Sequence, residues 1–230
     1  MMEQYTTYSE TNNEIVFEKN KVYNVDCFDL IKIIPDDSLD LIITDPPYGN
    51  NIKLGTYKKE IKNNKDETIN YRFLDAIYPK MKNNTTLYLF SDHKNVFKIK
   101  EHALKIGYKY KMICILVKPM MGFGWAFRNQ YETCLVLEKG KPQYNRKDMS
   151  NVWFSKYIQK TKDSHPHEKD INIIRKIILH SSKEGDLIFD GFMGTFTTAI
   201  ACIKENRNFI GAELDKKWYD YGTKKLEHIK

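Results

Sequence analysis

A short apolar run in the first quarter of the chain ends abruptly in a carboxylate, two prolines and an aromatic. Leu41 to Ile43 are typical of a strand buried in a parallel sheet, and Asp45-Pro46-Pro47-Tyr48 follows directly. The prolines fix φ and remove two backbone N–H donors, so the directions of the carbonyl groups are set. The sequence therefore predicts a strand that ends in a rigid cluster of acceptors.

This cluster suits a planar ring that carries an amino group. The Asp45 carboxylate and the Pro46 carbonyl are acceptors, and Tyr48 offers a flat face for stacking. A rigid surface turn is the alternative for so short a string. The position after a strand favours a site, because open α/β sheets bind ligands at the carboxyl ends of their strands. The predicted catalytic residues are Asp45, Pro46, Pro47 and Tyr48.

A second motif, residues 185–199, reads as a strand, a glycine-containing turn and the start of a helix, the layout of a nucleotide-type cofactor loop. Gly194 lets the backbone approach a ligand, and the threonines that follow are expected helix caps. The next strand ends in acid about 20 residues later, the offset at which a carboxylate accepts from ribose hydroxyls. The predicted cofactor contacts here are Asp190, Phe192, Gly194, Thr195, Thr197, Thr198, Glu213 and, as a second choice to Glu213, Asp215.

The two motifs together resemble the S-adenosylmethionine-dependent amino-methyltransferases, whose signature is Asp-Pro-Pro-Tyr. The string from His165 to Lys169 is similar to the family's His-Pro-x-Gln/Glu-Lys element, and Asp26-Cys27 matches the end of its opening strand. The resemblance implies that Asp26, Cys27, His165 and Lys169 help to hold S-adenosylmethionine, with a helix cap as the alternative for Asp26. The catalytic motif precedes the cofactor motif, which is the order of the circularly permuted β-group.

The resemblance covers nearly the whole chain and implies an α/β, Rossmann-like methyltransferase fold. We expect a mostly parallel seven-stranded sheet with a late antiparallel hairpin, in one domain over residues 1–230. A length of 230 residues and a hydrophobic content of 41% can supply one such core. The patterns predict helices over 67–81, 93–106 and 171–179, a strand over 86–90 and hairpin strands over 110–117 and 132–138.

The cofactor loop departs from the family pattern Asp-Pro-Phe-x-Gly-Ser-Gly at its end, where this chain has Phe196. If that position needs a positive φ or direct contact with the cofactor, a phenylalanine costs on the order of 1–2 kcal/mol or blocks the pocket. We favour a turn wide enough for the ring to pack beneath it. Asp170 replaces a common proline, and either residue can start a helix.

Basic residues gather in polar, turn-rich segments. The formal net charge is +7. Residues 53–65 carry five lysines against one glutamate, and residues 139–169 carry eight Lys or Arg against three acids. A solvated basic surface is the alternative, but their place beside a base pocket favours phosphate contacts. The loops at about 50–66, 118–130 and 139–168 are expected to face DNA, with contacts from Asn50, Lys53, Lys58, Lys59, Lys118, Arg128, Arg146 and Lys147.

The remaining composition indicates a small enzyme without a metal. Cys27, Cys114, Cys134 and Cys202 lack paired metal-ligand spacing and read as reduced core residues. No stretch approaches the length of a membrane span and no apolar signal core is present, so we expect a cytoplasmic location.

The predicted reaction is direct methyl transfer from S-adenosylmethionine to adenine N6 in DNA. The base is expected to be flipped out of the duplex, or already single-stranded, and stacked on Tyr48. Within the family Asp-Pro-Pro-Tyr usually goes with adenine and Ser-Pro-Pro-Tyr with cytosine N4. The alternatives are a cytosine N4 enzyme, an RNA adenine enzyme, a protein glutamine methyltransferase and an inactive nucleic-acid-binding subunit. A homodimer is also expected, to which the aromatics of residues 123–127 could contribute.

Overall fold

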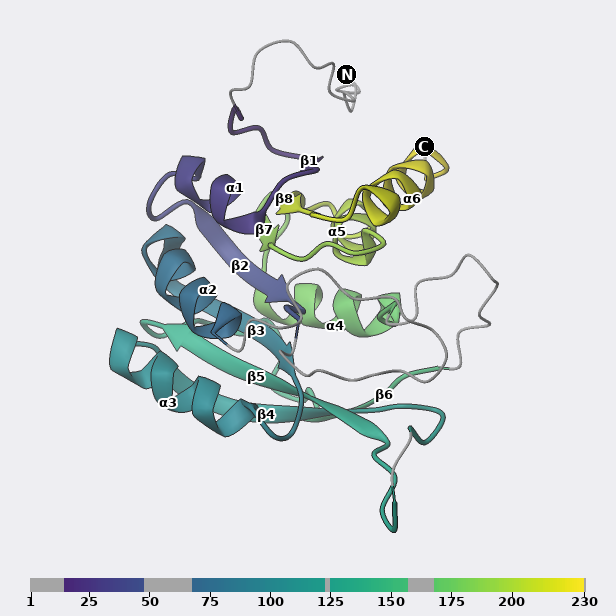
Figure 1. Cartoon of the computed structure of the whole chain (residues 1–230). Helices are drawn as coiled ribbons and strands as arrows, with labels where there is room; N and C mark the ends of the chain where they lie inside the picture. Colours follow the sequence, from purple (N-terminus) through teal and green to yellow (C-terminus); the bar gives the residue numbers. More distant parts are fainter. Residues whose placement is uncertain (1–14, 48–67, 123–124, 157–167, 230) are drawn as a thin grey trace.

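Eight strands form one sheet with helices on both faces (Figure 1). The structure is a computed structural model that describes residues 15–47, 68–122, 125–156 and 168–229. In chain order the elements are β1 (Lys21–Tyr23), α1 (Cys27–Ile33), β2 (Leu39–Thr44), α2 (Ile69–Ile77), the 3-10 helix η1 (Tyr78–Lys80), β3 (Met81–Ser91), α3 (Val96–Ile106), β4 (Lys109–Val117), β5 (Tyr131–Lys139), β6 (Val152–Phe154), α4 (Ile171–Ser181), β7 (Leu187–Asp190), α5 (Thr197–Lys204), β8 (Asn208–Ala212) and α6 (Lys216–Glu227).

The strands lie in the order β1-β8-β7-β2-β3-β5-β4-β6. The first five are parallel to one another, and β5 runs antiparallel to both β3 and β4. The expected mostly parallel sheet with a late hairpin is therefore confirmed. The expected count of seven strands is wrong, because the three residues of β6 add a parallel edge strand to β4. Trp153 is the one buried residue of β6, too few for a periodic pattern.

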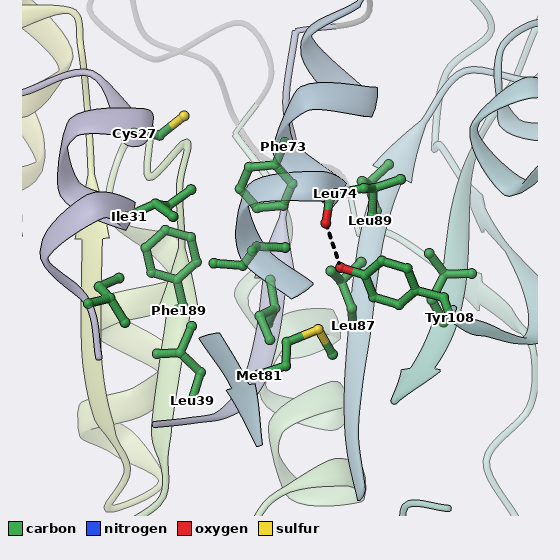
Figure 2. Close-up of a cluster of buried hydrophobic side chains, with 14 of the residues drawn as sticks. Cys27, Ile31, Leu39, Phe73, Leu74, Met81, Leu87, Leu89, Tyr108 and Phe189 are labelled. Atoms are coloured by element: carbon green, nitrogen blue, oxygen red, sulfur yellow. Dashed lines mark hydrogen bonds between the residues drawn. The ribbon is translucent and has the colours of Figure 1, made fainter. Parts of the chain in front are cut away.

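Alternate residues of β3 enter two separate cores. Leu87 and Leu89 face the core beneath α1, α2 and α3, whereas Tyr88 and Phe90 face the opposite core. This is the period of two expected for a strand buried on both faces. Figure 2 shows part of the first core, where the Tyr108 hydroxyl donates to the Leu74 carbonyl at 3.1 Å.

The second core lies beneath α4, α5 and α6, on the other face of the sheet (Figure 1). Helix α4 presents to it four isoleucines with the spacing of one helical face, Ile173, Ile174, Ile177 and Ile178. Asp170 caps this helix as predicted, because its carboxylate accepts from the Asn172 N–H at 2.9 Å.

The predicted helices and strands exist, with different ends. Helix α2 stops at Ile77 because Pro79 follows, and Met81 already belongs to β3. Helix α3 begins at Val96, three residues later than predicted, and α4 runs two residues further. The first and last residues of a helix or strand are determined by caps and turns, and the hydrophobic periodicity of the sequence does not predict these.

The four cysteines are buried and free of disulfides, so the prediction of reduced core residues is confirmed. In the described part of the chain no helix has the length and apolarity needed to cross a membrane. The described residues also contain no cluster of His, Cys, Asp or Glu suited to a metal ion.

Candidate active site at the carboxyl ends of four parallel strands

Four neighbouring strands bring acidic side chains to one edge of the sheet. Strands β1, β8, β7 and β2 are parallel and adjacent, so their carboxyl ends meet at the same edge. The acids at or just after these ends are Asp26, Glu213, Asp190 and Asp45, in that spatial order. Two motifs that lie far apart in the sequence therefore meet in space.

Asp45 follows β2, and its carboxylate is held by a lysine. Its Oδ2 lies 2.6 Å from the Nζ of Lys169, and the two side chains are 25% and 12% exposed. Pro46 is buried and Pro47 half-buried, as the expected rigid end of the strand requires. Lys169 was expected to hold the cofactor, and its ammonium group contacts the Asp45 carboxylate. Tyr48 and His165 lie outside the described residues.

Glu132 completes this cluster, and the sequence patterns did not single it out. Its Oε2 lies 2.8 Å from Lys169 Nζ, and its Oε1 lies 2.6 Å from the Nζ of Lys118. Burial raises the pKa of Glu132, but the two ammonium groups outweigh it and hold the pKa at about 2. Burial likewise lowers the pKa of Lys169, yet Asp45 and Glu132 keep it above its usual value. Glu132 and Lys169 are therefore both charged at neutral pH.

Lys118, a predicted DNA contact, is the second partner of Glu132, and its side chain is 40% exposed. It lies at the base of the β4–β5 hairpin, where its backbone N–H donates to the Gln130 carbonyl at 2.7 Å. A carboxylate among the buried residues of β5 was the one sequence signal for this pairing, because a buried charge requires a partner.

Asp190, the last residue of β7, is hydrogen-bonded to the end of β2. It is 5% exposed, and its oxygens accept from the Thr44 hydroxyl at 3.1 Å, the Phe192 N–H at 3.0 Å and the Thr198 hydroxyl at 2.7 Å. Burial raises its pKa to about 6 despite these donors. Asp190 and Thr198, both expected to contact the cofactor, are hydrogen-bonded to one another, and Asp190 also accepts from Thr44, the residue before Asp45.

Glu213 lies after β8 and faces the glycine loop. Its two oxygens accept from the N–H groups of Gly194 at 2.7 Å and Asp215 at 2.8 Å. Burial raises its pKa to about 7, and the two N–H donors only partly oppose this. Asp215 itself caps α6, since its carboxylate accepts from the Lys217 N–H at 2.9 Å. Of the two predicted acids, Glu213 is the one positioned at the loop.

The turn before α5 places Phe196 in the left-handed region and buries its ring. Its φ is 64° and its ψ 26°, and the side chain is 1% exposed. The ring packs against Tyr219, with ring centroids 5.7 Å apart, and over Gly222, where a Cβ would lie 2.4 Å from ring atoms. The φ is therefore positive, the condition under which a phenylalanine is strained, and the ring packs beneath the turn, which was the favoured alternative.

The expected threonine caps of α5 are wrong, because Phe196 occupies the N-cap position and makes no side-chain cap bond. Thr195 and Thr197 are buried, with their hydroxyl oxygens 3.3 Å apart. Phe192 is half-buried and packs on Phe73, with the ring centroids 5.6 Å apart. The loop is therefore held by a contact between its own threonines and by packing against α2 and α6.

Asp26 is the N-cap of α1, the alternative that its sequence context allowed. Its Oδ1 accepts from the Phe28 N–H at 2.9 Å. Cys27 is 4% exposed, and its side chain belongs to the first core, as Figure 2 shows, so its cofactor contact stays a prediction. Asp26 still lies at the site edge, because β1 neighbours β8.

A cavity of about 610 Å³ opens beside Lys169. Thr197, from the cofactor loop, lines it together with Lys169. Lys156, Glu168, Asp170 and Lys225 add charged groups to its wall. Two residues that were predicted to hold the cofactor, Lys169 and Thr197, thus line the same cavity.

The predicted basic contacts that the structure describes are exposed but partly engaged. Arg146 makes two contacts with Asp148, at 3.0 and 2.9 Å, and Lys147 is exposed between them. Arg128 donates to the Gly122 carbonyl at 2.7 Å and so closes its own loop. Asn50, Lys53, Lys58 and Lys59 lie outside the described residues.

The backbone of the glycine loop is open at Gly194. A Cβ at Gly194 would find no atom within 4 Å, whereas one at Gly191 would lie 2.9 Å from the Phe73 ring. Gly194 therefore faces open space beside the Glu213 carboxylate, whose oxygens each have acceptor capacity left. An open backbone turn beside a carboxylate fits a ligand with ribose hydroxyls.

This fold defines a class of α/β methyltransferases. The crystal structure of M1.HpyAVI is 25% identical, with a TM-score of 0.69 over 90% of this chain and 98% of that one. The PvuII cytosine-N4-specific DNA methyltransferase has a TM-score of 0.74 at 16% identity, over 93% and 92% of the two chains, which shows a shared fold.

The family follows from the sequence. A family model described as DNA methylase, covering N6 and N4 methyltransferases, matches residues 39–224, and the chain belongs to this family. Type II methyltransferase M.HinfI of Haemophilus influenzae is 27% identical over 92% of this chain and 69% of its own length. DNA adenine methyltransferase YhdJ of Escherichia coli K12 is 26% identical over 91% and 83%. The predicted S-adenosylmethionine-dependent DNA methyltransferase is thus confirmed at the level of the family.

Proposed function

We propose that this chain methylates N6 of adenine in DNA. The observation that carries the proposal is the Asp45 carboxylate, fixed by Lys169 at the end of a buried strand and followed by Pro46. Adenine is favoured over cytosine because the motif begins with aspartate. A relative named as a DNA adenine methyltransferase, 26% identical, supports this choice.

Asp45 and Pro46 act on the amino group. The exocyclic amine is a weak nucleophile, since its lone pair is delocalised into the ring. Hydrogen bonds from its two protons to the Asp45 carboxylate and the Pro46 carbonyl stabilise the positive, tetrahedral nitrogen as it develops. S-adenosylmethionine, when bound, supplies the methyl group on a sulfonium. The departing proton passes to Asp45 or to water.

The remaining residues hold the two ligands. Glu213 and the open turn at Gly194 are the residues that would bind the ribose side of S-adenosylmethionine. Asp190 keeps the ends of β2 and β7 together, and with them the two halves of the site. A target base must leave the duplex stack, and Tyr48 is proposed to stack on it, which offsets part of the few kcal/mol of unstacking.

The tip of the β4–β5 hairpin is proposed to meet DNA. Trp125 is 97% exposed and Phe127 92% exposed. Exposed aromatic side chains stack on unpaired bases and tolerate any sequence. A second copy of the chain is the other partner that this tip suits, and sedimentation of the protein with and without DNA separates the two.

The experiment compares wild type, Asp45→Ala and Asp36→Ala on unmethylated genomic DNA with labelled S-adenosylmethionine. Asp36 is the matched control, because it also pairs with a lysine, Lys80 at 2.7 Å, but precedes β2 instead of following it. The digested nucleosides are resolved by mass. We expect N6-methyladenine from wild type and Asp36→Ala only. N4-methylcytosine would correct the base, and product from Asp45→Ala would contradict the proposed role of Asp45.

A further inference from the structure

Glu132 is a buried carboxylate near the start of β5, just before a run of four buried apolar residues. It is 8% exposed, and Cys134, Leu135, Val136 and Leu137 follow it within the cores. Burying a charge in such surroundings is costly unless it is paired. The fold retains Glu132 with both oxygens on ammonium groups, and a lysine in contact with the catalytic carboxylate is one of the two partners.

The four side chains form an alternating row of charges. Lys118, Glu132, Lys169 and Asp45 contact one another in that order, at 2.6, 2.8 and 2.6 Å. Their formal charges sum to zero. The Lys169 ammonium group is shared between two carboxylates, so Glu132 neutralises part of its charge. The Asp45 carboxylate therefore stays a strong hydrogen-bond acceptor for a ligand.

We propose that Glu132 is a positioning residue for methyl transfer, which orients Lys169 on Asp45 and balances the charge around the target amine. The inference rests on the proposed function, since it assigns Glu132 to the same site. The nitrogen becomes positive as it attacks, so the local charge matters most in the transition state. Without the Glu132 carboxylate the row carries a net charge of +1, which opposes that nitrogen.

The first test is Glu132→Gln, with Glu138→Gln as the matched control. Glu138 lies on the same strand and pairs with Lys111 at 3.4 Å, but at the opposite end of β5. We expect Glu132→Gln to lower kcat about 10- to 100-fold with the KM for S-adenosylmethionine within about twofold, a loss typical of displaced catalytic groups. Glu138→Gln should keep wild-type kcat.

The second test is charge rescue. Adding Lys118→Met to Glu132→Gln returns the row to a net charge of zero. We expect the double variant to recover at least about threefold in kcat over Glu132→Gln alone, although it has lost one more native contact. A purely structural role predicts the opposite, a further fall in kcat together with a lower Tm.

The outcomes separate this inference from the proposed function. Wild-type kcat in Glu132→Gln, or loss without rescue, would overturn the role of Glu132 and leave adenine methylation standing. N4-methylcytosine from wild type would overturn the base assignment, and the same kcat ratios on cytosine would still support Glu132. No methyl transfer by wild type to any nucleic acid would overturn both.

Discussion

Replacing Phe196 with glycine should weaken the fold and leave cofactor binding unchanged. The residue has φ 64°, a conformation that costs an L-residue roughly 1–2 kcal/mol and a glycine almost nothing. Its ring, however, is 1% exposed and packs against Tyr219 and Gly222. The substitution therefore removes a backbone strain and a buried aromatic at the same position.

The packing loss should outweigh the strain relief. Truncating a buried phenylalanine costs about 3–5 kcal/mol, and relief of the left-handed φ returns about 1–2. We expect Phe196→Gly to lower the free energy of unfolding by about 1–4 kcal/mol. The ring points beneath the turn, toward α6, whereas the open space lies at Gly194. The Kd for S-adenosylmethionine should therefore change by less than about twofold.

Urea unfolding followed by tryptophan fluorescence measures the first quantity, and calorimetric titration measures the second. Phe196→Leu is the control, because it keeps an apolar side chain and the strained φ and should lose about 1–2 kcal/mol. The reasoning is refuted if Phe196→Gly unfolds at higher urea than wild type, or if it binds S-adenosylmethionine ten times more tightly. The second result would mean that the ring obstructs the cofactor.

Three further predictions rest on single contacts. Gly222→Ala should destabilise by about 1–2 kcal/mol in urea unfolding, although alanine favours a helix, because its Cβ would lie 2.4 Å from the buried phenylalanine ring; a gain in stability would contradict that contact. Burial raises the pKa of Glu213 to about 7 from an ordinary 4.5, so its contribution to stability is full below pH 4.5 and is lost as the pH rises through 7. The free energy of unfolding, measured from pH 5 to 8, should therefore fall as the pH rises, and the fall should be smaller in Glu213→Gln. An equal fall in wild type and Glu213→Gln would show that another group is responsible. Asp148→Asn should free Arg146 and tighten DNA binding a few-fold at low salt, as measured by fluorescence anisotropy, and weaker binding would place this loop away from DNA.

The features that depend on neighbouring residues could be predicted from the sequence. The end of β2 at Thr44, the glycine loop and the acid after β8 follow from short patterns, because strand ends and turns are set by neighbouring residues. The cap at Asp170 follows for the same reason. Asp26 was predicted from the resemblance, and Asp215 from its spacing after the glycine turn, to contact the cofactor. In the structure both are helix caps, and either role is compatible with the residue type.

The cluster around Asp45 could not be predicted, because its members come from distant segments. Lys169 and Glu132 meet only once β5 has paired with β3, and no local pattern reports that pairing. The same holds for Asp190, whose partners include Thr44, 146 positions away. What the sequence does show is a charge in a buried strand, and such a charge indicates that a partner exists without identifying it.

The pairing of β1 with β8 has a consequence for the order of folding. Asn20 donates to Asn208 at 2.9 Å, and these partners are 188 positions apart. Strands β2 to β5 can find one another early during synthesis, whereas β1, made first, must wait with an unpaired edge until almost all of the sheet has been translated. The pairing of β1 with β8 is thus the last to form in the sheet. A ribosome-bound chain halted before residue 208 should lack this pairing, and with it the part of the site that contains Asp26 and Glu213.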